Sequence, residues 1–149
     1  MKEALNECFD KGLLKKIDKN KKFALQDLIQ AKFFLNEAED LIELDKKEMA
    51  LIALYNAVFH SARAILFDEG VKEKSHYCMQ KYLEEIASEG KQVTLDDVAL
   101  FDSLRGIRQE TQYGLVRIRI EEDLSELFNR TEEFLRKISK FISPKEQSE

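Results

Sequence analysis

The most strongly apolar stretch of the chain runs from Met49 to Phe67 and has almost no polar face. A helix that is apolar on nearly every side is buried on nearly every side. Asn56, His60 and Arg63 occur at spacings of four and three residues, which places them on one narrow stripe of such a helix. These groups would be costly in hydrocarbon, and the apolar run is barely long enough to cross a bilayer. The stretch is therefore predicted to be the central helix of a soluble bundle.

Other segments of the chain also repeat apolar residues with a helical period. They cover residues 23–44, 75–90, 94–112 and 124–143, and a weaker pattern covers the first ten residues. The polar turn at Asp45–Glu48 is short, so the helix before it and the central helix should be antiparallel neighbours. We predict an all-α bundle of four to five main helices plus a short N-terminal helix. Residues 1–149 should form a single domain, with 1–22 as a weaker N-terminal arm and 144–149 as a frayed tail.

Two segments depart from the helical period. Residues 115–120 alternate apolar and polar side chains, which predicts an extended connector with Arg117 and Arg119 on one side. A lysine-rich run follows the N-terminal arm, from Lys15 to Lys22. Such a run is most often a solvated junction, which is the interpretation that we favour; a basic arm for RNA is the alternative.

The composition supports helix and narrows the class of partner. The chain has only five glycines and one proline, which favours helix over sheet. Its net charge of −5 argues against a broad electrostatic footprint for duplex DNA, although a local basic cleft remains compatible with it. Cys8 and Cys78 have no metal-ligand spacing and predict no disulfide framework, and no signal-peptide pattern opens the chain. We therefore expect a cytoplasmic protein.

The polar stripe Asn56, His60 and Arg63 is the first candidate site. Polar groups on an apolar helix need partners, because burying one unpaired costs about 1–3 kcal/mol. Taken alone, the stripe is best explained as structural, with His60 satisfied in the core and Arg63 paired with a carboxylate. The alternative is that the stripe faces a bound ligand.

The second candidate is the segment LRGIRQETQYG, from Leu104 to Gly114. Arg105 and Arg108 are three residues apart and share a helix face. Tyr113 is five residues past Arg108 and would point away on a regular helix. We therefore expect the two to meet only where the helix unwinds near Gly114. A structural interpretation, with two surface arginines and an anchoring tyrosine, has about equal standing.

No cofactor or metal is expected from the sequence. The two histidines, His60 and His76, have no acidic residue at ligand spacing. The chain also lacks a glycine-rich phosphate loop and a nucleophile elbow.

Three segments, in this order and spacing, resemble the HEPN domain family, the helical partners of minimal nucleotidyltransferases. They read ALYNAVFHSARAILFDEG, KSHYCMQKYL and LRGIRQETQYG, and the upstream CFDKGLLKKI resembles the leading part of one branch of the family. The resemblance extends from about Cys8 to Ile142. It implies an up-and-down helical bundle, commonly a homodimer, with a cleft where two protomers meet.

Active toxins of that family carry an arginine, a polar residue, a few further residues and a histidine, a motif implicated in metal-independent RNA cleavage. In this chain Arg108 matches the arginine, Gln109 the polar residue, and Tyr113 stands where the histidine would be. A phenol, with an unperturbed pKa of about 10, is a poor general base at neutral pH, where an imidazole, at about 6.5, is well placed. The resemblance with this departure implies binding of RNA or nucleotides with weak or no cleavage.

The leading interpretation is a toxin-like component of a HEPN and nucleotidyltransferase pair, homodimeric and without membrane contact. Arg108 would contact phosphate, with Arg63 and Arg105 as secondary cations. His60 and the neighbouring polar side chains would hydrogen-bond within the cleft, and Tyr113 would stack or donate. Two alternatives stay open: a metal-independent ribonuclease in which His60 supplies the base, and a non-catalytic protein-interaction module whose polar stripe is structural.

Overall fold

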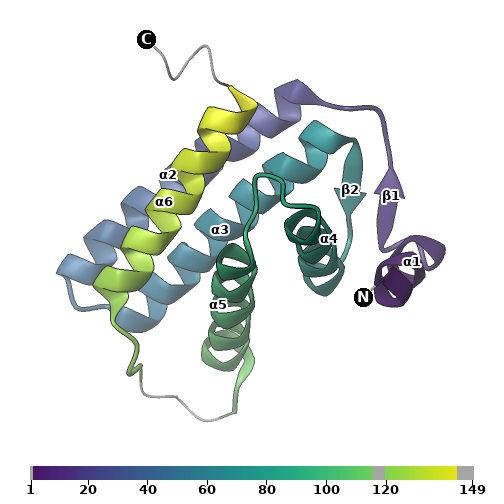
Figure 1. Cartoon of the computed structure of the whole chain (residues 1–149). Coiled ribbons are helices and arrows are strands. Elements are labelled where there is room, and N and C mark those ends of the chain that lie inside the picture. The colour runs from purple at the N-terminus through teal and green to yellow at the C-terminus, as the bar shows by residue number, and fades with distance from the viewer. Residues whose placement is uncertain (1, 116–119, 144–149) are drawn as a thin grey trace.

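The computed structural model describes residues 2–115 and 120–143, and within them it confirms an all-α helical bundle (Figure 1). The elements in chain order are α1 (Lys2–Asp10), β1 (Leu14–Lys16), α2 (Lys21–Glu43), α3 (Lys47–Glu69), β2 (Val71–Glu73), α4 (His76–Ser88), α5 (Leu95–Tyr113) and α6 (Leu124–Ile142). Five longer helices follow a short N-terminal one, as predicted. The predictions of an extended connector and of a frayed tail fall on residues 116–119 and 144–149, outside the described residues.

The core of the bundle is built around α3. Figure 1 shows α2, α3 and α6 lying alongside one another, with α5 and α4 packed beside them. Leu51, Leu54, Ile65 and Leu66 of α3 are fully buried, which confirms that the apolar stretch is the central helix. By length and composition α3 could cross a membrane, but 78% of its apolar window is buried inside the protein, as in the core helix of a soluble bundle.

The helix ends follow local signals in the sequence. Gly70 ends α3 in the left-handed region at φ 81°. A Cβ there would lie 2.6 Å from the Ile17 carbonyl oxygen, so the close approach of the N-terminal segment also requires glycine. Ser75 caps α4. Thr94 and Asp97 form a reciprocal capping box at α5, with aspartate in the place usually held by Glu or Gln.

A two-stranded antiparallel ribbon, β1–β2, was not predicted from the sequence. Lys15 pairs with Lys72, while Leu14 and Val71 are buried and anchor the ribbon to the bundle. The lysine-rich run is therefore not merely a solvated junction, because its first residues form a strand. Strands of three residues are too short to show a period of two, which is why the pattern along the chain carried no signal for them.

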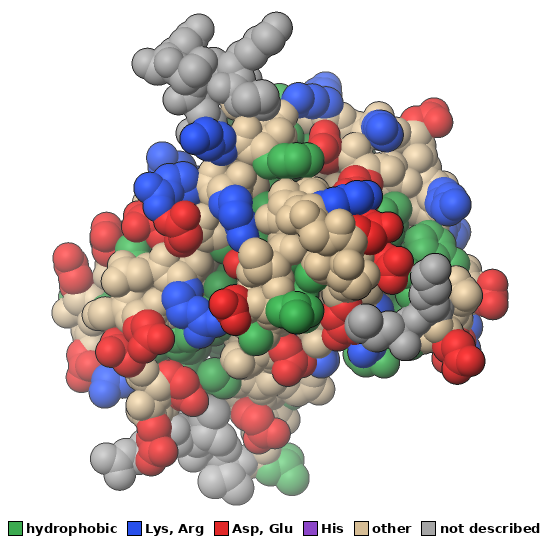
Figure 2. Space-filling model, in the orientation of Figure 1, with side chains coloured by type: hydrophobic (Ala, Val, Ile, Leu, Met, Phe, Trp, Pro, Cys, Tyr) green, Lys and Arg blue, Asp and Glu red, His purple; other side chains and the backbone are tan. Residues whose placement is uncertain are grey.

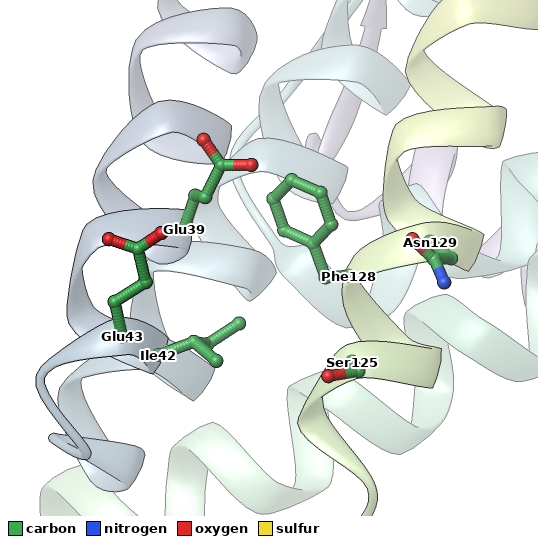
Figure 3. A pocket seen from close by; sticks show the side chains of 6 residues that line it. All are labelled: Glu39, Ile42, Glu43, Ser125, Phe128 and Asn129. Carbon is green, nitrogen blue, oxygen red and sulfur yellow. The ribbon is translucent and has the colours of Figure 1, made fainter.

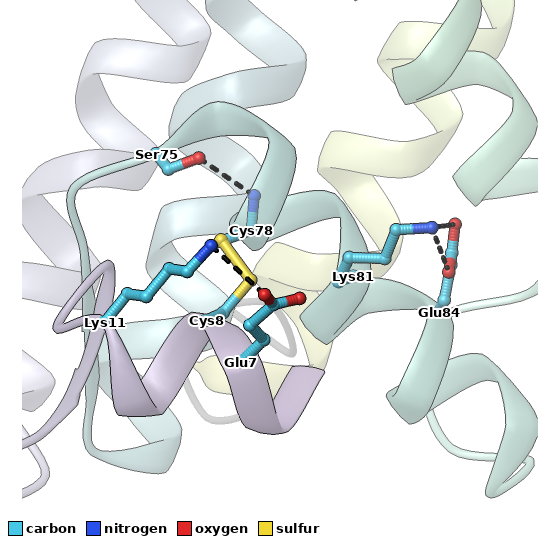
Figure 4. Close-up of a disulfide and its surroundings, with 7 residues drawn as sticks. All are labelled: Glu7, Cys8, Lys11, Ser75, Cys78, Lys81 and Glu84. Carbon is cyan, nitrogen blue, oxygen red and sulfur yellow. Dashed lines mark hydrogen bonds and ion pairs between the residues drawn. A yellow bond between two sulfur atoms is a disulfide. The ribbon is translucent and has the colours of Figure 1, made fainter. Parts of the chain in front are cut away.

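The expectation of no disulfide is wrong. Cys8 of α1 and Cys78 of α4 are joined by a disulfide, and both are buried (Figure 4). The two cysteines are 70 residues apart, and only the packing of α1 against α4 brings them together. Spacing along the chain therefore carried no information about this pair, and the location of the protein stays a prediction.

Replacing both cysteines, as Cys8→Ala/Cys78→Ala, should lower the free energy of unfolding by about 2–4 kcal/mol. The disulfide closes a loop of about 70 residues and so restricts the unfolded chain. Urea unfolding of the oxidised protein and of the variant measures the difference. The reduced wild-type protein is the control and should match the variant. Equal stability of all three would show that the disulfide is not formed in solution.

Candidate functional site

One buried carboxylate contacts both His60 and Arg63 of the polar stripe on α3. The sequence analysis did not single it out. Asp27 of α2 is only 4% exposed, and its Oδ1 lies 2.8 Å from His60 Nδ1. The guanidinium of Arg63 grips the same carboxylate through two nitrogens, with Nε 3.1 Å from Oδ2 and Nη2 3.0 Å from Oδ1. Asp27 lies on the apolar seam of α2, between Ala24 and Ala31. A charged residue on such a seam is the feature of the sequence from which this site could have been predicted.

Arg63 also links the stripe to the ribbon. Its Nη1 lies 3.6 Å from Glu73 Oε1 on β2, and its guanidinium covers the Phe59 and Phe67 rings. Burial raises the pKa of the Glu73 carboxyl, and the charge of Arg63 partly offsets this rise. The carboxylate partner expected for Arg63 is therefore present, in the form of Asp27 and Glu73 together.

The rest of the stripe is half-buried beside this ion cluster. The His60 ring stacks on Phe34 of α2, with ring centroids 5.5 Å apart and an interplanar angle of 9°. Asn56 lies one turn before His60 on the same face and is half-buried. Because Asp27 satisfies both His60 and Arg63, the structural interpretation accounts for most of the stripe.

A second cluster, which we call the Arg108 cluster, consists of Tyr55, His76, Arg108 and Tyr113. The Tyr55 side chain is fully buried, and its hydroxyl lies 2.5 Å from His76 Nδ1. The guanidinium of Arg108 lies over the Tyr55 ring at 5.2 Å and over the Tyr113 ring at 5.5 Å. Its Nη2 is also 3.5 Å from the Tyr113 hydroxyl oxygen. The cluster thus combines a cation, an imidazole and two aromatic rings.

The electrostatics of this cluster keep both His76 and Tyr55 neutral at pH 7. Burial lowers the pKa of His76, and the nearby charges of Arg108, Arg105 and Arg63 lower it further. Burial raises the pKa of the Tyr55 phenol. The phenol therefore keeps its proton. Because a phenol O–H is a stronger donor than the N–H of a neutral imidazole, we assign this hydrogen bond as donated by Tyr55 to His76 Nδ1, which places the imidazole proton on Nε2. His76 then offers an N–H donor rather than a free base.

Arg108 and Tyr113 meet as predicted, and they do so where the helix ends, between Gln112 and Gly114. α5 remains helical through Tyr113, and Gly114 follows as an extended C-cap residue. The contact forms because the long Arg108 side chain reaches over the last helical turn. The helix thus ends beside Gly114 as expected, although Tyr113 itself is still helical.

The other predicted residues differ in how closely they approach this cluster. Arg105 is held by Gln80, with 3.0 Å from Nε to Oε1, and by Asp102 at 3.5 Å. Gln109 is exposed on α5. The polar stripe and the Arg108 cluster are adjacent through Phe59, whose ring stacks on His76 with centroids 4.3 Å apart and also lies under Arg63. The sequence reasoning missed Tyr55, and it singled out His76 only as a second imidazole.

Arg108 differs from Arg63 and Arg105 in the groups that surround its guanidinium. Arg63 and Arg105 each have a carboxylate within ion-pair distance, but within residues 2–115 and 120–143 Arg108 has none. Among these residues, its guanidinium contacts the Tyr55 and Tyr113 rings and the Tyr113 hydroxyl group. An unpaired guanidinium beside an N–H donor and an exposed ring is suited to bind a phosphate with an attached base.

Candidate metal ligands and one pocket of the bundle complete the description of the surface. No group of three or more His, Cys, Asp or Glu that could hold a metal occurs in the part of the chain that the structure describes. A pocket of about 240 Å³ lies between α2 and α6 (Figure 3). It is lined by Glu39, Ile42, Glu43, Ser125, Phe128 and Asn129. None of these residues belongs to the stripe or to the Arg108 cluster.

The family model of the HEPN domain matches residues 26–141, which is well over half of the chain. The chain therefore belongs to the HEPN family. No protein with a curated description matches it. The matched part starts in α2 and ends in α6, so α1 and β1 precede it.

Replacing Asp27 by Asn should lower the free energy of unfolding by about 1–3 kcal/mol. The change leaves Arg63 and His60 without their shared carboxylate, and the cost is moderated because Arg63 is about one-third exposed. Urea unfolding measures the effect, with Asp40→Asn on the exposed side of the same helix as the matched control. If both variants lose the same small amount, Asp27 does not hold α2 to α3 in the way described.

Proposed function

We propose that this HEPN protein binds RNA or nucleotides through the Arg108 cluster and cleaves RNA weakly or not at all. The observation that carries the proposal is the position of Arg108, a cation without an acidic partner among the described residues, between two aromatic rings and beside a neutral imidazole. Arginine presents a planar fork that matches phosphate oxygens.

The other groups of the cluster fit a nucleotide ligand. The Tyr113 side chain is 62% exposed, so its outer face is free to stack on a base. In single-strand binders such stacking contributes about 1–3 kcal/mol per base. His76 Nε2–H adds a neutral donor next to the cation. Arg63 and Arg105 raise the local potential without being free to make a new ion pair.

Weak cleavage is expected because the His76 imidazole and the Tyr113 phenol are poor bases. His76 uses its Nδ1 lone pair to accept from Tyr55, which leaves its proton on Nε2. A phenol such as Tyr113 rarely acts as a base at neutral pH. Neither group can readily take the proton of a ribose 2′-hydroxyl.

A metal-independent ribonuclease is the second candidate function, and one contact favours it. A carboxylate can only accept, so His60 Nδ1 donates to Asp27, and in the neutral form of the ring the lone pair then lies on Nε2. This is the arrangement of an imidazole that serves as a general base. The partial burial of His60 under Phe34 and the competing grip of Arg63 on Asp27 count against it.

The proposal extends to partners on the basis of family membership. We propose a toxin-like role beside a minimal nucleotidyltransferase protein, and a homodimer. Ile29 and Phe33 on the outer side of α2 are 70% and 52% exposed, and large apolar side chains of this kind favour association. Light scattering distinguishes a dimer from the monomer mass of 17.4 kDa.

Replacing Arg108 by Ala should weaken binding of a short single-stranded RNA by about tenfold or more, since the change removes a charge-assisted hydrogen bond to phosphate. Fluorescence anisotropy in the presence of EDTA measures the affinity. Arg130→Ala, which removes an exposed arginine of α6, is the matched control and should bind normally. Equal affinity of the two variants for the RNA would contradict the proposal. If neither the variants nor the wild-type protein bound the RNA, the alternative of a non-catalytic protein-interaction module would be favoured.

The integrity of the RNA in the same samples separates binder from nuclease. The wild-type protein should leave the RNA intact, and Tyr113→His should raise cleavage because it restores an imidazole at that place. Efficient cleavage by the wild type that is abolished in His60→Gln would instead establish the ribonuclease function.

A further inference from the structure

The β1–β2 ribbon carries an arrangement of charge that is unfavourable for its own stability. Lys15 and Lys72 are register partners on antiparallel strands, and both are exposed. Their neighbours Leu14 and Val71 are buried, so the two lysines point to the outer face of the ribbon. Like charges directly opposite each other on one face destabilise a strand pair.

Lysines are also common on edge strands, where they prevent pairing with other molecules. Protection of an edge explains a lysine on each strand. It does not require that the two lysines lie directly opposite each other in the strand pair. Lys74 follows on the same side two residues later and is exposed, and its backbone N–H bonds to the Leu13 carbonyl at 2.9 Å. The outer face therefore presents three ammonium groups on a fixed backbone.

These lysines form no ion pair in the described part of the chain, although the charge of Lys72 partly offsets the rise that burial causes in the pKa of the adjacent Glu73 carboxyl. Among the described residues, none of Lys15, Lys72 and Lys74 has a carboxylate within ion-pair distance. Residues 11–22 contain six lysines and one acidic residue, in a chain whose net charge is −5. Elsewhere the two signs are mixed, as Figure 2 shows for the face seen there. The N-terminal segment is thus a local basic region on an acidic protein.

The ribbon leads directly to the Arg108 cluster. β2 ends at Glu73, and after Lys74 and Ser75 the chain enters α4 at His76. Four residues of extended chain span at most about 14 Å, so Lys72 lies within that distance of His76. The inner side of β2 faces the stripe through the contact of Glu73 with Arg63. The backbone of the ribbon therefore lies close to the Arg108 cluster, while its lysines project from the side opposite to the stripe.

We propose that the outer face of the ribbon, formed by Lys15, Lys72 and Lys74, holds the phosphodiester backbone of single-stranded RNA that extends beyond the nucleotide bound at the Arg108 cluster. This inference rests on the proposed function. Ammonium groups bind successive phosphates without regard to base, and they release counterions when they do so. Of the three lysines, Lys15 lies on β1, which precedes the part of the chain that matches the family model.

The test compares a 5′-phosphorylated trinucleotide with a 20-nucleotide single-stranded RNA, in EDTA and over a range of salt. Lys15→Gln/Lys72→Gln should weaken binding of the longer RNA by about tenfold at low salt. The slope of log affinity against log salt should fall by about 1.4, or about 0.7 for each phosphate that is no longer neutralised. The affinity for the trinucleotide should not change. Lys32→Gln/Lys140→Gln, two exposed lysines on α2 and α6, is the matched control.

The outcomes separate this inference from the proposed function. A ribbon variant with the wild-type salt slope on the longer RNA overturns the inference, even where Arg108→Ala abolishes trinucleotide binding. Loss of longer RNA binding in the ribbon variant and in the control alike also overturns it. Unchanged trinucleotide binding by Arg108→Ala overturns the proposed function instead. Because the ribbon variant relieves the Lys15–Lys72 repulsion, it should unfold at or slightly above the wild-type temperature, and the control variant at the wild-type temperature; this result shows that each change acts on binding.

Discussion

The carboxylate of Asp27 is the group on which the arrangement of this bundle most depends. It is buried between α2 and α3, and a buried charge is tolerated only where it is paired and hydrogen-bonded. His60 and Arg63 provide that pairing, and Arg63 carries the connection on to Glu73 of β2. One ionic cluster thus fixes the register of the two longest helices and the place of the ribbon against them.

The buried helix α3 holds the side chains of the neighbouring Arg108 cluster in place. Tyr55 and Phe59 project from the most buried helix of the described chain, and His76 stacks on Phe59 while its Nδ1 accepts from Tyr55. These contacts hold the His76 ring in one orientation, and with Tyr55 assigned as the donor the imidazole proton lies on Nε2. Side chains held by packing and hydrogen bonds in this way form a site that needs little reorganisation on binding. Arg108 and Tyr113 complete it from α5, at the point where that helix ends.

The sequence predicted most of the fold because the helices depend on local signals. The period of apolar residues, the Thr94 cap and the stop at Gly70 each act within a few residues. The features that it missed depend on contacts between distant segments. Asp27 lies 33 residues from His60, and the disulfide joins residues 70 apart. The ribbon strands of three residues are too short to show a pattern of their own.

The same distinction applies to the candidate site. Arg108 and Tyr113 are close in the chain, so their contact could be anticipated. The role of His76 could not, because its environment is made by Tyr55 and by arginines from other helices. The stripe at His60 was visible in the sequence, but its satisfaction by Asp27 required the packing of α2 on α3.

Nitrogen NMR of the histidine rings tests the central claim most directly, since it reports the protonation of each ring nitrogen. At pH 7 His76 should be neutral, with its proton on Nε2 and none on Nδ1, and its signals should shift when a 5′-phosphorylated trinucleotide is added. The His60 signals should respond less to the trinucleotide. A His76 ring with a free Nε2, or a trinucleotide that shifts His60 and leaves His76 unchanged, would contradict the account.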